Sequence, residues 1–293
     1  MWPWAPPPRP SLWKEYGRHA LLFVLTALSI YLMGGPFLAL GLLSILLAHE
    51  MGHYVACRLY GVDATLPFFI PAPMLSFVGT LGAFIRIRSP IPNRRALFDI
   101  GVAGPLAGFL VCLPVLVLGT LEARLIPAPP ADSRDYISFG NPLLIQWVFD
   151  WLRPDPTQGH TFLLGPLGLA AWFGLFVTAL NLMPIGQLDG GHAMYALLRR
   201  RAWRISRIGS WLCVGLVFLS PTWILWAILV RVLGRRHPPT LDDAAPLGRE
   251  RVWVGVLSLA VFVVCFVPTP IVVTWADFFE AVSPLLPRFL TGR

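Results

Sequence analysis

The sequence predicts an all-α protein that crosses a membrane about six times and carries one short re-entrant β-type loop. The first observation is composition: 56% of the 293 residues are apolar and 13% are charged, against roughly 25% charged in an average soluble domain. The second is a mean hydropathy of +0.67, with several apolar runs near the length of a bilayer crossing. A soluble chain with so little charge could not cover its own surface.

The charge of the chain argues against nucleic acid as a partner and indicates how the chain is oriented in a membrane. The formal net charge is +8 and the isoelectric point is about 9.9. The arginines behind these values gather at the ends of apolar segments and form no continuous stripe that could follow phosphates. We therefore expect the lipid bilayer, and no nucleic acid, as a partner. Basic loops instead mark the cytoplasmic side of a membrane protein.

Apolar runs between charged residues give the candidate spans, which lie at residues 19–33, 36–60, 100–121, 162–184, 208–234 and 252–275. The run at 208–234 is interrupted by Ser220 and Pro221. It is therefore either one kinked crossing or two short helices that turn back at the proline. Because arginines flank this run on both sides, the hairpin is favoured.

The basic residues also predict which loops face the cytoplasm. Arginines lie in the N-terminal tail and again at residues 86–95, whereas the loop at 122–161 has five acidic residues against three arginines. The tail and the 86–95 loop should be cytoplasmic, and the 122–161 loop should lie on the far side. Since arginine far outnumbers lysine, which is typical of a GC-rich genome, we expect a multi-pass protein of a bacterial inner (plasma) membrane.

Three regions follow from this reading of the chain. Residues 1–18 should form a cytoplasmic proline-rich tail, which lacks a leader cleavage signature and should be retained. Residues 19–198 should form a membrane-embedded core, and residues 199–293 should form C-terminal transmembrane segments and loops.

The apolar stretch at residues 66–87 cannot be a continuous helix, because three prolines and two glycines interrupt it. The β-type residues around its two glycines indicate a re-entrant loop or a short hairpin. Non-helical backbone at membrane depth persists only where protein or a water-filled cavity satisfies its polar groups. We therefore expect this loop to line a site. The alternative is a proline-rich cytoplasmic connector at the membrane interface.

The second apolar run contains His49-Glu50-Met51-Gly52-His53, an H-E-x-x-H motif. On a helix, positions i and i+4 share one face, so both imidazoles can bind one Zn²⁺ with Glu50 beside the open coordination position. A zinc-bound water is acidified toward neutrality, and Glu50 could act as its general base. A chance motif is disfavoured, because ionisable groups in an apolar helix are costly without partners.

A third metal ligand should be another buried acid or histidine at the same depth. Asp189 fits, because it follows Pro184 and Gly186, which should unwind the fourth apolar run, and precedes two glycines that allow close backbone approach. In the predicted topology it falls in the same cytoplasmic half of the bilayer as the H-E-x-x-H motif. The alternative for Asp189 is an ordinary helix N-cap. The GPLAG sequence at 104–108 predicts a helix-packing face.

These residues resemble the paired signatures of the site-2 protease family (peptidase family M50) of intramembrane zinc metalloproteases. The second signature is Asn181-x-x-Pro184-x-x-x-Leu188-Asp189-Gly190-Gly191. The resemblance extends over residues 42–198, and the stretches at 79–108 and 237–243 are similar to the bacterial, cyanobacterial and plastid branch. Family members often carry a regulatory PDZ or CBS domain; we expect neither here, so a regulatory partner could take that role.

The resemblance implies a metalloprotease that cleaves membrane-protein substrates, most simply single-pass ones. It implies one Zn²⁺ per chain, held by His49, His53 and Asp189, with Glu50 activating water. Asn181 would position the substrate or stabilise the oxyanion, or alternatively serve only as an interhelical hydrogen bond. The β-type loop would present its edge to an unwound substrate; the substrate-binding residues would be Val78, Gly79, Thr80, Leu81 and Gly82. The rival function is a proteolytically inactive relative that acts as a membrane chaperone or a metal-binding or transport protein.

Overall fold

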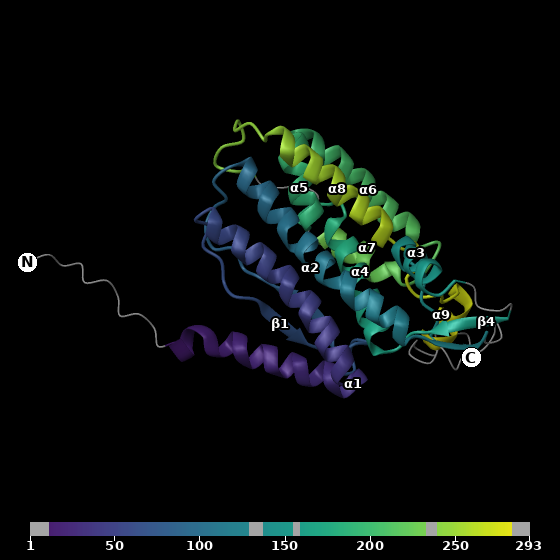
Figure 1. The fold of residues 1–293 in the computed structure, drawn as a ribbon. Helices are drawn as coiled ribbons and strands as arrows, with labels where there is room; N and C mark the ends of the chain where they lie inside the picture. The colour runs from purple at the N-terminus through teal and green to yellow at the C-terminus, as the bar shows by residue number, and fades with distance from the viewer. Residues whose placement is uncertain (1–11, 129–136, 155–158, 233–238, 283–293) are drawn as a thin grey trace, which may run out of the picture.

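The computed structural model describes residues 12–128, 137–154, 159–232 and 239–282 (Figure 1). Most of the predicted proline-rich tail at 1–18 lies outside these residues. Helices dominate, with two small pairs of strands. In chain order the elements are α1 (Leu12–Leu59), β1 (Phe68–Pro71), β2 (Thr80–Phe84), α2 (Arg94–Glu122), β3 (Arg124–Pro127), α3 (Leu143–Leu152), β4 (His160–Leu163), α4 (Pro166–Leu182), α5 (Asp189–Leu198), a 3-10 turn (Arg199–Arg201), α6 (Ala202–Leu216), α7 (Trp223–Val232), α8 (Arg249–Cys265) and α9 (Trp275–Val282).

α1 is a helical hairpin with two arms. Gly34 and Gly35 leave helical geometry, and Gly35 has φ 79°, a left-handed conformation that glycine adopts without strain. Pro36 then opens the second arm, where its fixed φ suits a helix start. In Figure 1 the purple first arm and the blue second arm meet at this turn and diverge from it, with β1 between them. The turn falls at the predicted boundary between the first two apolar runs.

Within the part of the chain that the structure describes, two helical stretches are long and apolar enough to cross a membrane by length and composition. They are Tyr16–Leu59, which contains both arms of α1, and Arg94–Glu122. The fourth and last predicted spans correspond to α4 and α8, which have 17 residues each. The mostly helical architecture therefore agrees with the predicted class.

The predicted β-type loop is a short antiparallel pair, β1 with β2. Phe68 pairs with Phe84 and Phe69 with Ala83, and the register shifts before the pair of Pro71 with Thr80. The loop packs on the first arm of α1, where the Ser29 hydroxyl donates to the Gly79 carbonyl over 2.6 Å. A short hairpin therefore follows the H-E-x-x-H helix.

One region differs from the sequence expectation, and a second agrees with the favoured alternative. The 122–161 stretch, expected as a loop, holds α3 and the strand β3, which pairs antiparallel with β4; residues 129–136 and 155–158 of it lie outside the described residues. The interrupted run at 208–234 contains two helices, α6 and α7. The Arg231 guanidinium near the end of α7 lies 4.4 Å from the Trp211 ring in α6, as an antiparallel hairpin requires.

α2 is the central helix of the bundle and contacts α1, α4 and α5. It begins at an N-cap, Asn93, whose side chain accepts a hydrogen bond from the Ala96 amide. The chain segment after α7 crosses this end of α2: the amides of Leu241 and Asp242 donate to the carbonyls of Ile91 and Pro92. Residues 237 and 238 of that segment lie outside the described residues.

Candidate metal centre

His49 and His53 lie on one face of the second arm of α1, one helical turn apart. Both side chains are buried, and the residues are 4% and 7% exposed. Their Nε2 atoms approach to 3.2 Å. The i, i+4 spacing read from the sequence thus brings two potential ligand atoms to one point, as the motif predicted.

Asp189 reaches the same point from a tight turn between α4 and α5. α4 ends at Leu182, and α5 begins at Asp189, with Gly186 at φ 54° between them. A side chain at Gly190 would lie 2.1 Å from the Leu182 carbonyl oxygen, so this turn can close only with glycine there. The unwinding predicted around Pro184 is therefore present, and the glycines pack against the turn itself.

The three candidate ligand atoms converge. Asp189 Oδ2 lies 3.2 Å from His53 Nε2 and 3.4 Å from His49 Nε2. In a tetrahedral zinc site with bonds of about 2.0–2.1 Å, ligand atoms are about 3.3 Å apart. The three residues, which together form a group able to hold a metal ion, therefore fit Zn²⁺ in both donor type and spacing. Asp189 faces the histidines instead of serving as a simple helix cap.

A second observation fits a cation at this point. His53 Nδ1 lies 2.7 Å from the Ile100 carbonyl oxygen in α2, and only a protonated Nδ1 can make that hydrogen bond. In the neutral ring, Nε2 then carries a lone pair. That lone pair faces a carboxylate oxygen and a second imidazole nitrogen, an arrangement that a shared cation stabilises. A backbone carbonyl on the outer nitrogen is also the usual support of a metal-binding histidine.

Small residues of α2 allow this close packing. A side-chain carbon at Gly104 would lie 2.1 Å from His53 Nε2, and one at Gly108 would lie 3.1 Å from His49 Cβ. The GPLAG sequence is therefore a packing face, as predicted, and the surface it packs against is the pair of histidines. Any larger residue at Gly104 would occupy the space of the candidate ligand.

Glu50 lies beside the triad and is 6% exposed. Its carboxylate lies close enough to interact with the backbone of Ile85, the residue that follows β2. The β1–β2 loop therefore reaches the glutamate directly. This contact places an acid, three potential metal ligands and a strand end in one buried site.

Asn181 comes from the last turn of α4. Its Nδ2 lies 3.3 Å from His49 Nε2, so its amide borders the same point as the three ligand atoms. Four residues from two distant parts of the chain thus meet, and each was a candidate from the sequence.

The five loop residues proposed to bind substrate have different environments. Val78 is 4% exposed and belongs to a buried apolar cluster with the first arm of α1. The Gly79 carbonyl accepts a hydrogen bond from the Ser29 hydroxyl, and the Thr80 hydroxyl donates to the Ile70 carbonyl over 2.8 Å. Leu81 is 63% exposed, and Gly82 is half-buried. Val78 and Gly79 therefore hold the loop against α1, and the residue in contact with Glu50 is Ile85.

The sequence did not reveal two backbone groups that border the site: the backbone of Ile85 beside Glu50, and the carbonyl of Ile100 beside His53. Backbone groups leave no signature in residue identity, so no sequence signal pointed to them. The role of Gly104 could be predicted, because two glycines four residues apart in an apolar run mark a helix face that a neighbouring helix approaches closely. Only the identity of the residues it approaches was missing.

An apolar helical bundle with two buried histidines, the half-buried Asp189 and an adjacent glutamate defines a candidate hydrolytic metal centre in a membrane-type fold. The family model described as Peptidase family M50 matches residues 37–220, which include all of these residues. The chain belongs to peptidase family M50, the site-2 protease family.

Curated relatives point to the same family. The chain is 31% identical over 238 residues to "Probable zinc metalloprotease EGY1, chloroplastic" of Oryza sativa subsp. japonica, covering 78% of this chain and 40% of the relative. It is 29% identical over 254 residues to the EGY1 protein of Arabidopsis thaliana, covering 84% and 44%. The EGY2 protein of Oryza sativa subsp. indica is 31% identical over 250 residues, covering 82% and 44%. The chain therefore spans less than half the length of these relatives.

Proposed function

We propose that this chain is an intramembrane zinc metalloprotease that hydrolyses peptide bonds within or near transmembrane segments of membrane proteins. The observation that carries the proposal is the convergence of His49, His53 and Asp189 within 3.2–3.4 Å beside the buried Glu50. Membership of a peptidase family and relatives named as zinc metalloproteases support it.

In this proposal His49, His53 and Asp189 hold one Zn²⁺ per chain. When bound, the ion would supply a Lewis acid that polarises the scissile carbonyl and acidifies water. Glu50 accepts the proton of the attacking water on its carboxylate and returns it to the leaving amine. Asn181 is a preorganised donor whose amide can hydrogen-bond to the developing oxyanion.

The substrate must expose its backbone before any such reaction. A transmembrane helix uses all its peptide groups in internal hydrogen bonds, so we propose that it unwinds and pairs as an added strand with the β1–β2 loop. The 78–82 segment anchors that loop and offers Leu81, and the 83–85 segment extends the pairing edge to Glu50. A single-pass membrane protein is the simplest substrate for such an edge, and a separate regulatory partner would control access to it.

We further propose that the chain is multi-pass, with its N-terminus and the catalytic side facing the cytoplasm of a bacterium. The basic loops at 86–95 and 199–207 support this orientation. The printed names of the relatives assign those proteins to chloroplasts; in a plastid membrane the same loop charges would face the stroma.

The inactive-relative alternative is disfavoured, because an inactive relative would be expected to lack the glutamate or a ligand. Here the glutamate and all three ligands are present and adjacent. Metal transport also gives no reason for the Glu50 contact with the Ile85 backbone, whereas strand pairing of a peptide beside a general base does.

The direct test is Glu50→Gln in the full chain, reconstituted in vesicles with a single-pass test substrate whose span contains glycine. The variant should keep its zinc, and the cleavage rate should fall at least about 100-fold, since a general base contributes about 10²–10⁴. Mass spectrometry of the products locates the cut. Chelator-treated wild-type protein is the matched negative control. Equal cleavage by the Gln variant, or zinc release into the vesicles without proteolysis, would contradict the proposal.

A further inference from the structure

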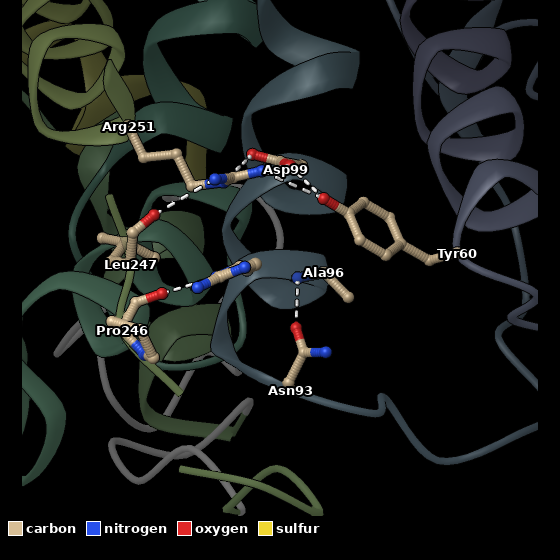
Figure 2. Close-up of polar contacts among 8 residues, drawn as sticks. Tyr60, Asn93, Ala96, Asp99, Pro246, Leu247 and Arg251 are labelled. Atoms are coloured by element: carbon tan, nitrogen blue, oxygen red, sulfur yellow. Dashed lines mark hydrogen bonds and ion pairs between the residues drawn. The ribbon is translucent and has the colours of Figure 1, made fainter. Parts of the chain in front are cut away.

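Arg251, at the start of α8, forms a forked ion pair with Asp99 in α2 (Figure 2). Its Nε lies 2.9 Å from Asp99 Oδ1, and its Nη2 lies 2.7 Å from Oδ2. The Tyr60 hydroxyl, just beyond the H-E-x-x-H helix, donates to the same carboxylate. Arg251 also donates to the Leu247 carbonyl over 3.1 Å. One carboxylate thus joins α1, α2 and α8.

The position of this pair relates it to the candidate metal centre. Asp99 directly precedes Ile100, whose carbonyl accepts the 2.7 Å hydrogen bond from His53 Nδ1. Fixing the Asp99 side chain therefore fixes the helical turn that carries the acceptor. The path from Arg251 to His53 runs through one ion pair, one peptide unit and one hydrogen bond.

α2 is poorly suited to hold this turn by itself. Gly101 and Gly104 have no side chains to lock the helix, and Gly104 lies against the His53 ring. Pro105 has no amide hydrogen to bond to the carbonyl of Gly101, so one helical hydrogen bond is missing next to Ile100. An external anchor on Asp99 supplies the rigidity that the glycines and the proline remove.

We propose that Arg251 is a positioning residue for the metal centre, acting through Asp99 on the Ile100 carbonyl that orients His53. The inference rests on the proposed metal site and adds to it a residue outside the family match at residues 37–220. A forked guanidinium fixes both the position and the rotation of a carboxylate, whereas a lysine ammonium fixes position alone. Partners that orient a metal-binding histidine typically change metal affinity 10–100-fold.

The chain offers a matched control for this proposal. Arg95 lies on the same helix, one turn before Asp99, and donates to the Pro246 carbonyl in the segment that leads into α8. Arg95→Gln therefore removes an arginine that links the same two parts of the chain but does not touch Asp99. A general loosening of α8 from α2 would affect both arginine variants.

The test uses the full chain in detergent and measures zinc affinity by chelator competition, and the visible spectrum of the cobalt-loaded protein. Arg251→Gln and Asp99→Asn should each weaken zinc binding about 10-fold and alter the cobalt spectrum, and the double variant should be no weaker than either single one. Arg251→Lys should restore part of the affinity. Arg95→Gln should keep the wild-type affinity and spectrum.

Each outcome decides one claim. Wild-type zinc affinity in folded Arg251→Gln, or equal losses in Arg95→Gln and Arg251→Gln, would overturn the positioning role while leaving the metal site intact. A wild-type protein that binds no zinc would overturn the proposed function as well. If Arg251→Gln does not fold, the comparison of Arg251→Lys with Arg95→Gln decides: equal zinc affinities would overturn the role, and a loss confined to Arg251→Lys would support it.

Discussion

The carboxylate of Glu50 and the backbone of Ile85 lie close enough to interact, so the candidate general base is next to the end of strand β2. The next residue, Arg86, directs its carbonyl the opposite way, toward the amide of Thr65 at 3.0 Å. Successive residues of an antiparallel strand present their backbone groups to opposite edges. The backbone of Ile85 therefore belongs to the edge that faces Glu50, the edge a peptide could extend.

This relationship predicts the effect of removing one amide. Ile85→Pro keeps an extended backbone but deletes the amide hydrogen that is available to the nearby Glu50 carboxylate. A hydrogen bond to a charged group contributes about 1.5–3 kcal/mol, so kcat/KM for a membrane substrate should fall about 10–100-fold with zinc content unchanged. Ile85→Val, which retains the amide, is the control. A Pro variant as active as the Val variant would separate β2 from catalysis.

Gly104→Ala should damage the metal centre by steric conflict. The added methyl would lie 2.1 Å from His53 Nε2, so the ring must rotate away from the other ligands. We expect zinc affinity, measured by chelator competition, to fall at least about 10-fold. Gly215→Ala in α6 is the control, because nothing lies within 4 Å of a side chain there and alanine favours a helix. Equal affinities in the two variants would rule out the close packing of α2 on His53.

Asn181→Ala distinguishes a donor to the reacting carbonyl from an interhelical contact. Its Nδ2 lies 3.3 Å from His49 Nε2, at the border of the site. Loss of one preorganised donor costs about 3 kcal/mol in the transition state, so kcat should drop at least about 100-fold with KM and zinc content nearly unchanged. A lowered unfolding temperature with normal kcat would instead assign Asn181 to helix packing.

Alkaline pH should break the hydrogen bond between Tyr195 and Asp243, which lies outside the candidate membrane spans. The Tyr195 hydroxyl donates to Asp243 Oδ2 over 2.6 Å, and burial together with this bond raises the pKa of Tyr195 to about 12. Because an unfolded tyrosine has a pKa of about 10, the stabilisation is complete below pH 10 and is lost as the pH rises toward 12.

The measurement is the difference in unfolding temperature between wild type and Tyr195→Phe. Below pH 10 the wild type should be more stable by a few degrees, since a hydrogen bond to a charged group contributes about 1.5–3 kcal/mol. That difference should shrink between pH 10 and 12. A difference that stays constant over this range would show that the tyrosine proton is not involved.

Much of the candidate site could be predicted from the sequence, because its chemistry lies in residue types at short spacings. His49 and His53 are four residues apart on a helix, and Asp189 stands between residues that break a helix. Each is an ionisable group in an apolar run, where such a group needs a function or a partner. The Gly34–Gly35 turn could also be predicted, since glycines and a proline separate two apolar runs.

Other features depend on contacts that no local pattern encodes. The Asp99–Arg251 pair joins residues 152 positions apart; each charge was visible in the sequence, but their pairing was not. The packing of Val78 and Gly79 on α1 follows from which face of the loop meets the helix, and β-type residues alone do not fix that face. The β3–β4 pair could not be predicted for the same reason, because short strands are specified mainly by their partners.

The central claim is that two distant segments share one metal ion, and zinc content tests it most directly. Purified full-length wild type and Asp189→Ala should be compared by elemental analysis after identical washing. The account predicts about one zinc per wild-type chain and a loss of most of it in the variant, because a structural or catalytic zinc site needs at least three protein ligands. Zinc absent from the wild type, or retained in full without Asp189, would contradict it.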